Sequence, residues 1–209
     1  MFSGLSGFGL VVVLVSIIIS MAIHEATHGF VAHWLGDPTA LEEGRLTLNP
    51  LKHVDVVTTV ALPMVLIIVG LPPIFAAKPV PFDPSRLRYG EFGMALVGVA
   101  GPVTNLVLAA LAALVFHGWG LDFGQNFYNA LILFVQVNIA FFVFNMIPFP
   151  PLDGSRLLYA FAPEPLQDLM RQIEGFGFMG ILIFILLVFQ FISGPLLGIE
   201  NFFMQFLLG

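Results

Sequence analysis

The chain has 209 residues, of which 58% are hydrophobic and only 10% are charged. Soluble domains carry about 45–50% apolar and about 25% charged residues, so this composition excludes an ordinary soluble protein. The net charge of −6, with seven Lys and Arg residues, excludes a nucleic-acid-binding protein of the usual basic kind. The absence of Cys excludes disulfides, thiolate metal sites and cysteine nucleophiles. We therefore predict an all-α polytopic membrane protein that is embedded in the lipid bilayer.

Long runs without charged residues predict four spanning helices. They cover about residues 8–35, 92–116, 127–147 and 175–195. The first run lacks a basic start and leads directly into His24 and Glu25, so it does not resemble a cleavable signal peptide. A short apolar segment follows at the C-terminus, over residues 201–209. We expect residues 1–209 to form a single membrane-embedded domain.

The segment at about residues 54–90 does not fit a regular helix. Its uncharged run, Val56–Ala77, contains several prolines, and prolines break or kink helices. Two arrangements are open: a fifth spanning helix, or a re-entrant or short extended segment that enters and leaves on one side. Only the second arrangement puts all seven basic residues on the same side of the membrane, as the positive-inside rule requires for the cytoplasmic face. We therefore expect the re-entrant arrangement, with the connections around it in the cytoplasm.

The residues His24-Glu25-Ala26-Thr27-His28 form an HExxH motif at the end of the first apolar run. Residues four apart share one face of a helix, so His24 and His28 can both bind one zinc ion. Glu25 lies beside them, where it can take a proton from a zinc-bound water. The alternative is a pair of histidines in the polar interior of a bundle. Ionisable groups inside a membrane are costly and usually functional, which favours the metal site.

A catalytic zinc needs a third protein ligand and an open position for water. Asp153 is the best candidate, because it follows a long uncharged run and the predicted topology brings it to the same end as His28. Prolines precede Asp153, and irregular backbone at membrane depth is tolerated where it lines a polar cavity. The alternative is that Asp153 caps a helix or a turn. Other candidates have less suitable positions: His33, Glu42, Glu43, His53, Asp55 and His117.

Three motifs occur in order along the chain. The HExxH motif is followed by Gly101-Pro102-Val103-Thr104-Asn105 and then by Asn145-Met146-Ile147-Pro148-Phe149-Pro150-Pro151-Leu152-Asp153-Gly154. Together they resemble the site-2 proteases, which are zinc-dependent intramembrane metalloproteases with a Gly-Pro-x-x-Asn motif and an asparagine, prolines and Leu-Asp-Gly in the last motif. The resemblance covers about residues 8–160. It includes Ala77-Lys78-Pro79-Val80-Pro81, a segment that looks like one in compact prokaryotic members.

The resemblance implies a compact metalloendopeptidase without a PDZ domain. One zinc ion per chain would be bound by His24, His28 and Asp153, and Glu25 would be the catalytic base that activates water. Asn145 would contact the substrate backbone or the developing oxyanion; the alternative is a hydrogen bond between helices. The substrate would be a transmembrane protein, cut in or near its membrane segment. The resemblance also implies a multi-pass protein of a prokaryotic plasma membrane, with its active site open to the cytoplasm.

The alternating prolines of the segment Lys78–Phe82 predict extended backbone. This segment is either a strand to which an unwound substrate can add or a proline-rich turn at the membrane surface. Two other functions remain as alternatives, a non-catalytic zinc-binding membrane scaffold and a membrane transporter. Glu25 disfavours the scaffold, because metal binding does not require it, and the transporter is disfavoured because no inverted repeat is visible.

Overall fold

The computed structural model describes residues 6–53, 78–119, 122–177, 179–180, 184 and 190–209. The regular secondary structure of these residues is helical, without a strand, which confirms the predicted all-α class. Among them, four helices are long and apolar enough to cross a membrane. They are α1 (Gly7–Trp34), α4 (Glu91–Trp119), α5 (Gln125–Asn145) and α9 (Gln190–Leu208, with Phe191–Leu208 as the candidate span). The short helices are α2 (Thr39–Glu42), η1 (Pro50–Lys52), η3 (Pro84–Arg86), α6 (Gly154–Phe161) and α7 (Glu164–Gly175).

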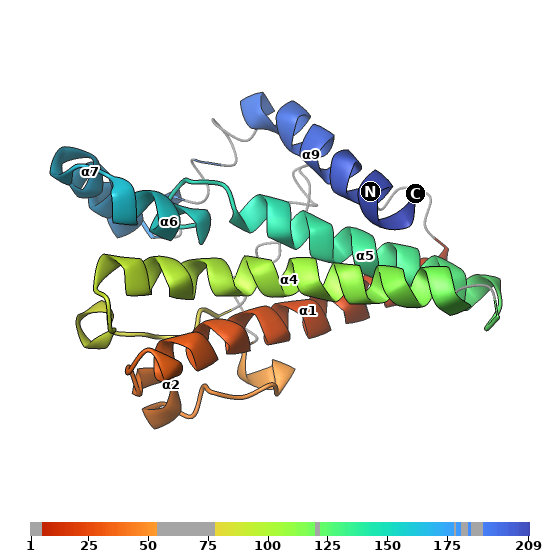
Figure 1. The fold of residues 1–209 in the computed structure, drawn as a ribbon, viewed down its shortest axis with the longest axis horizontal. Helices are drawn as coiled ribbons and strands as arrows, with labels where there is room; N and C mark the ends of the chain where they lie inside the picture. Colours follow the sequence, from red (N-terminus) through yellow and green to blue (C-terminus); the bar gives the residue numbers. More distant parts are fainter. Residues whose placement is uncertain (1–5, 54–77, 120–121, 178, 181–183, 185–189) are drawn as a thin grey trace.

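The helices α1, α4 and α5 lie side by side along most of their length, and α9 packs against α5 and α4 (Figure 1). Small side chains on α4 make the close approach to α5 possible, as is usual between membrane helices. The buried cluster at this interface consists of Ala109, Ala112, Ala113, Val135, Ile139 and Val143. Leu196 and Phe203 of α9 cover the same cluster. The arrangement leaves the HExxH motif of α1 facing α4.

Helix α1 carries this motif without interruption. It begins at Ser6, whose side chain accepts a hydrogen bond from Gly9 N at 3.1 Å, and it ends before Gly36, whose φ of +107° is unfavourable for other residues. The Val and Ile residues between them are weak helix formers in water. In a bilayer, however, every backbone polar group needs a partner within the segment, and the helix supplies it.

The expected span at residues 175–195 is described only in part, because residues 178, 181–183 and 185–189 lie outside the described residues. Helix α7 ends at Gly175, and α9 runs from Gln190 to Leu208. Among the described residues, the candidate span in this part of the chain is Phe191–Leu208. Glu200 interrupts the uncharged run on which the expectation rests. A single acidic side chain removes no backbone hydrogen bond, so α9 continues through it, and the expected apolar segment 201–209 is mostly its second half.

We call one end of the bundle the basic end, because the short helices and connections that gather there carry the basic residues. In Figure 1 the end of α1, the start of α4, the end of α5 and the short helices α2, α6 and α7 gather at this end. The basic residues belong to these helices or to the segments that join them: Arg45, Lys52, Lys78, Arg86, Arg88, Arg156 and Arg171. Of the expected re-entrant or extended segment at about residues 54–90, residues 54–77 lie outside the described residues. Its two flanks are in contact, because Lys78 N donates to His53 O at 2.8 Å.

Candidate metal centre

The two histidines of the HExxH motif share one buried face of α1, as their spacing predicts. The side chains of His24 and His28 point toward α4, and the two residues are only 6% and 8% exposed. Their Nε2 atoms lie 3.0 Å apart. The helix therefore presents two imidazole nitrogens to one point in the interior of the bundle.

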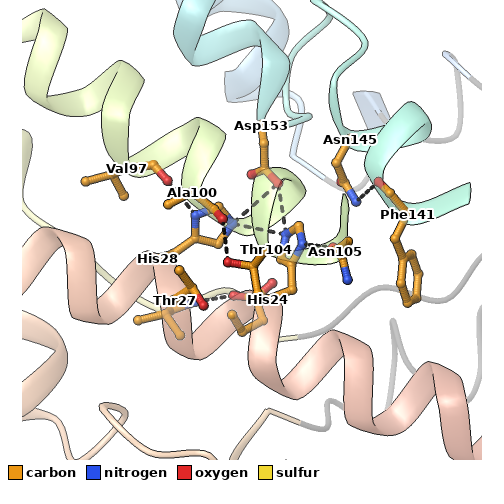
Figure 2. Close-up of polar contacts among 12 residues, drawn as sticks. His24, Thr27, His28, Val97, Ala100, Thr104, Asn105, Phe141, Asn145 and Asp153 are labelled. Atoms are coloured by element: carbon orange, nitrogen blue, oxygen red, sulfur yellow. Dashed lines mark hydrogen bonds and ion pairs between the residues drawn. The ribbon is translucent and has the colours of Figure 1, made fainter. Parts of the chain in front are cut away.

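Asp153 comes to the same point from the other side (Figure 2). Its Oδ2 atom lies 3.0 Å from His24 Nε2 and 3.4 Å from His28 Nε2. Asp153 occupies the N-cap position of α6, but its side chain makes no capping hydrogen bond, so the alternative of a simple helix cap is not realised.

Gly154 explains how Asp153 reaches this position. A Cβ atom on Gly154 would lie 2.3 Å from Met146 O, so the chain folds back tightly over the end of α5. Only a glycine permits this approach, and the preceding prolines prevent α5 from continuing. The irregular backbone expected between Asn145 and Asp153 is thus present, and it turns the carboxylate toward α1.

The second nitrogen of each imidazole is bound to a hydrogen-bond acceptor. His28 Nδ1 lies 2.7 Å from Val97 O, and His24 Nδ1 lies 2.6 Å from Asn105 Oδ1. A carbonyl oxygen has no hydrogen to donate, so both Nδ1 atoms carry the proton. In the neutral imidazoles both Nε2 atoms then present lone pairs toward each other and toward Asp153. Such outer partners are typical of histidines that bind metals.

The residues present fit a metal ion. The ligand atoms of His24, His28 and Asp153 all lie within 4.8 Å of one another, and together they offer two nitrogen lone pairs and a carboxylate. Three such acceptors repel one another unless a cation lies between them. Gly101 of α4 leaves space there, since a Cβ atom on it would lie 2.4 Å from His28 Nε2 and 2.6 Å from His24 Nε2. Two imidazoles and one carboxylate are a donor set of catalytic zinc sites.

Glu25 of the motif is half-buried and has a defined partner. Its Oε2 atom accepts a hydrogen bond from Val80 N at 2.9 Å. The Val80 side chain is buried against α1, where Gly29 leaves room for it: a Cβ atom on Gly29 would lie 3.0 Å from Val80 Cγ1. The predicted extended segment Lys78–Phe82 therefore crosses α1 and holds one oxygen of the Glu25 carboxylate.

Two charged residues that the sequence analysis did not single out hold this segment. Arg45 is 8% exposed, and its Nη2 donates to Lys78 O at 2.9 Å and to Pro79 O at 3.4 Å. Asp37 is fully buried, and its Oδ2 accepts from Asp83 N at 2.6 Å. The segment is thus fixed on both sides of Val80. Nothing in the sequence alone distinguishes Arg45 and Asp37 from charged residues of a solvated loop.

Asn145 lies to one side of the histidines and Asp153 (Figure 2). Its Nδ2 donates to Phe141 O of the same helix at 3.0 Å. Within the described part of the chain, one N–H and the oxygen of this amide have no further hydrogen-bond partner. Asn105, by contrast, contacts His24 directly and is fully buried. A further buried amide, Asn138, contacts Asn105 and was missed in the sequence analysis, because an isolated Asn on an apolar helix matches no motif.

The remaining histidines have other partners. His53 Nε2 lies 2.8 Å from Thr47 O, and His117 Nε2 lies 2.8 Å from Leu207 O at the end of the bundle opposite the basic end. His33 is exposed at the end of α1. Glu42 is exposed and pairs with Arg86. Asp55 lies outside the described residues.

The chain is similar to several known proteins over most of its length. It is 33% identical over 193 residues to the protein named "Putative zinc metalloprotease YwhC" of Bacillus subtilis, covering 88% of this chain and 85% of that protein. It is 25% identical to the protein named "Putative zinc metalloprotease Rip2" of Mycolicibacterium smegmatis, covering 84% and 67% of the two chains. It is 26% identical to the protein of the same name from Mycobacterium tuberculosis, covering 86% and 66%. No protein-family model and no solved structure matches the chain. Because the first of these relatives is 33% identical over most of both chains, this chain belongs to the zinc metalloprotease family of YwhC.

Proposed function

We propose that this protein is a zinc-dependent intramembrane endopeptidase of the site-2 protease type. It would hydrolyse peptide bonds in or near the transmembrane segments of membrane proteins. The observation that carries the proposal is the convergence of His24 Nε2, His28 Nε2 and Asp153 Oδ2 at a helix that is long and apolar enough to cross a membrane. Membership in a zinc metalloprotease family supports the protease activity.

In this proposal His24, His28 and Asp153 hold one zinc ion per chain. A zinc ion with three protein ligands and an open position acidifies water and polarises a carbonyl group. The protonated Nδ1 atoms of both histidines keep their Nε2 lone pairs directed at the ion. Gly101 keeps the space beside these nitrogens free.

Glu25 acts as the general base and then as the general acid. Its carboxylate takes a proton from the attacking water and later delivers that proton to the nitrogen of the leaving amine. The hydrogen bond from Val80 N to Oε2 orients the carboxylate and leaves Oε1 for the proton. Positioned acid–base groups of this kind contribute about 10²–10⁴-fold to a rate.

Asn145 and the segment Lys78–Phe82 would act on the substrate. The free N–H of the Asn145 amide can donate to the oxyanion that forms at the scissile carbonyl. Within the described residues, Val80 O and Phe82 N have no hydrogen-bond partner, so an unwound substrate can pair with them as an added strand. Unwinding is needed because a helical substrate hides its amides in its own hydrogen bonds.

The charge distribution supports an orientation in the membrane. Positively charged connections are retained in the cytoplasm, so the basic end would face it in a prokaryotic plasma membrane. In this proposal the site opens toward this end, since the segments that carry Asp153 and Val80 adjoin the short helices that gather there. Water would reach the zinc ion from the cytoplasm.

The experiment is cleavage of a panel of single-span membrane proteins by the purified protein in detergent. Wild type, Glu25→Gln and the control Glu43→Gln are compared, with zinc determined on the same samples. Glu43 is exposed at the end of α2, so this control removes a carboxylate that belongs to none of the site's described contacts. We expect cleavage by wild type and by the control only, with zinc in all three. Zinc binding without cleavage by wild type would favour the non-catalytic scaffold instead.

A further inference from the structure

Three buried side chains form a continuous hydrogen-bonded path from α5 to the histidines. Asn138 and Asn105 are both 0% exposed, and both lie at the interface of the spanning helices. Asn138 Nδ2 donates to Phe134 O at 2.9 Å. Asn105 Nδ2 donates to Asn138 Oδ1 at 3.0 Å, and His24 Nδ1 lies 2.6 Å from Asn105 Oδ1.

The hydrogen bond to Phe134 O fixes the orientation of both amide groups in this path. Phe134 O is a backbone carbonyl and can only accept, so the NH₂ group of Asn138 must point toward it. Asn138 Oδ1 then faces Asn105, and the NH₂ group of Asn105 must point toward Asn138. As a consequence Asn105 Oδ1 faces His24, Nδ1 of His24 carries the proton, and Nε2 is left with its lone pair.

A reversed Asn105 amide would have the opposite effect. Its NH₂ group would face His24 Nδ1, and the proton of a neutral His24 would move to Nε2, where it would block a metal. Ser20 O also lies near Asn105 Nδ2, but at 3.5 Å it is a weak acceptor. The strong determinant of the Asn105 orientation is therefore Asn138.

We propose that Asn138 is a positioning residue for the metal centre: through the orientation of the Asn105 amide it keeps His24 Nε2 available for the ion. Asn138 itself touches neither the histidines nor Asp153. The inference rests on the proposed zinc site and assigns a function to a residue outside the HExxH, Gly-Pro-x-x-Asn and Leu-Asp-Gly motifs. Loss of an outer hydrogen-bond partner typically weakens metal binding about 10–100-fold.

The test is a double-mutant cycle on the affinity for Zn²⁺. Asn138→Leu, Asn105→Asp and the double variant are compared with wild type by competition with a chelator in detergent. An aspartate at position 105 has two equivalent acceptor oxygens, so it needs no neighbour to orient it toward His24. We expect Asn138→Leu to weaken zinc binding about 10-fold in the wild-type background and less than about 2-fold in the Asn105→Asp background.

Two controls separate this effect from general damage. Asn129→Leu makes the same change at an exposed position of the same helix and should leave zinc affinity unchanged. Thermal unfolding of the metal-free proteins reports folding, and Asn138→Ser serves if the leucine variant does not fold. A serine hydroxyl both donates and accepts, so it does not dictate the direction of the Asn105 amide, and zinc binding should weaken as with leucine.

The outcomes distinguish the inference from the proposed function. If wild type binds no zinc, the proposed function is wrong. If wild type binds zinc and the Asn138 variants bind it equally well, only the role of Asn138 is wrong. An equal loss in the wild-type and Asn105→Asp backgrounds would also overturn that role, because it would show that Asn138 acts through packing and not through the amide.

Discussion

Gly101→Ala tests the geometry of the proposed zinc site with a single methyl group. The new Cβ atom would lie 2.4 Å from His28 Nε2, about 1 Å closer than an ordinary contact of 3.4 Å. Zinc–ligand distances are held to within about 0.2 Å. To make room for the methyl group, an imidazole must move by several times this distance of about 0.2 Å. If the imidazole does not move, the methyl group occupies the space of the ion. We expect zinc affinity to fall about 100-fold or more, which corresponds to about 2.7 kcal/mol.

The assay is a zinc titration against a chelator, with thermal unfolding in the presence of chelator as the control for folding. Gly118→Ala is the matched variant, because it makes the same change in the same helix with nothing within 4 Å of the new Cβ. This control should bind zinc like wild type and gain up to about 1 kcal/mol of stability, since Ala favours a helix over Gly. A folded Gly101→Ala variant with wild-type zinc affinity would refute the site as described.

Three further predictions concern the residues around the site. Arg45→Met should raise the KM for cleavage about 5-fold at unchanged zinc content, because it removes the hydrogen bonds that hold Lys78 O and Pro79 O. An unchanged KM would show that the segment Lys78–Phe82 does not take part in substrate binding. Asp37→Asn should lower the free energy of unfolding by about 1–3 kcal/mol, because an amide cannot replace a buried carboxylate that accepts from three donors; thermal melting measures this. Gly154→Ala should lose both zinc and thermal stability, because the new Cβ meets Met146 O at 2.3 Å, whereas Gly175→Ala, with nothing within 4 Å of the new Cβ, should lose neither.

The sequence predicts the proposed zinc ligands because their chemistry imposes a spacing. The separation of four residues between His24 and His28 places both on one helix face, and the structure confirms that they converge. Asp153 lies far along the chain from His28, and no periodicity connects them. Its position followed from the charge-based topology, which brought the end of the third span and the end of the first to the same side. The contact of Asp153 with both histidines agrees with that reasoning.

Other features of the site depend on distances that no local pattern encodes. Gly101 resembles any glycine that lets two helices pack, but its missing side chain lies beside the two imidazoles. From the sequence, Arg45 is one more basic residue of a loop; only the structure shows that it is buried and that it donates to Lys78 O and Pro79 O. The same holds for Asn138, whose role depends on two helices meeting. The extent of α9 beyond residue 195 could not be predicted from the uncharged runs either, because Glu200 ends such a run without ending the helix.

The most direct test of the proposed activity is to titrate metal-stripped wild-type protein with Zn²⁺ and to measure bound zinc and substrate cleavage on the same samples. We predict that cleavage rises in proportion to bound zinc and reaches its plateau at about one zinc ion per chain. The Glu25→Gln variant should bind zinc along the same curve and remain inactive throughout. Cleavage by the metal-stripped protein, or cleavage by zinc-loaded Glu25→Gln at the wild-type rate, would contradict the proposal.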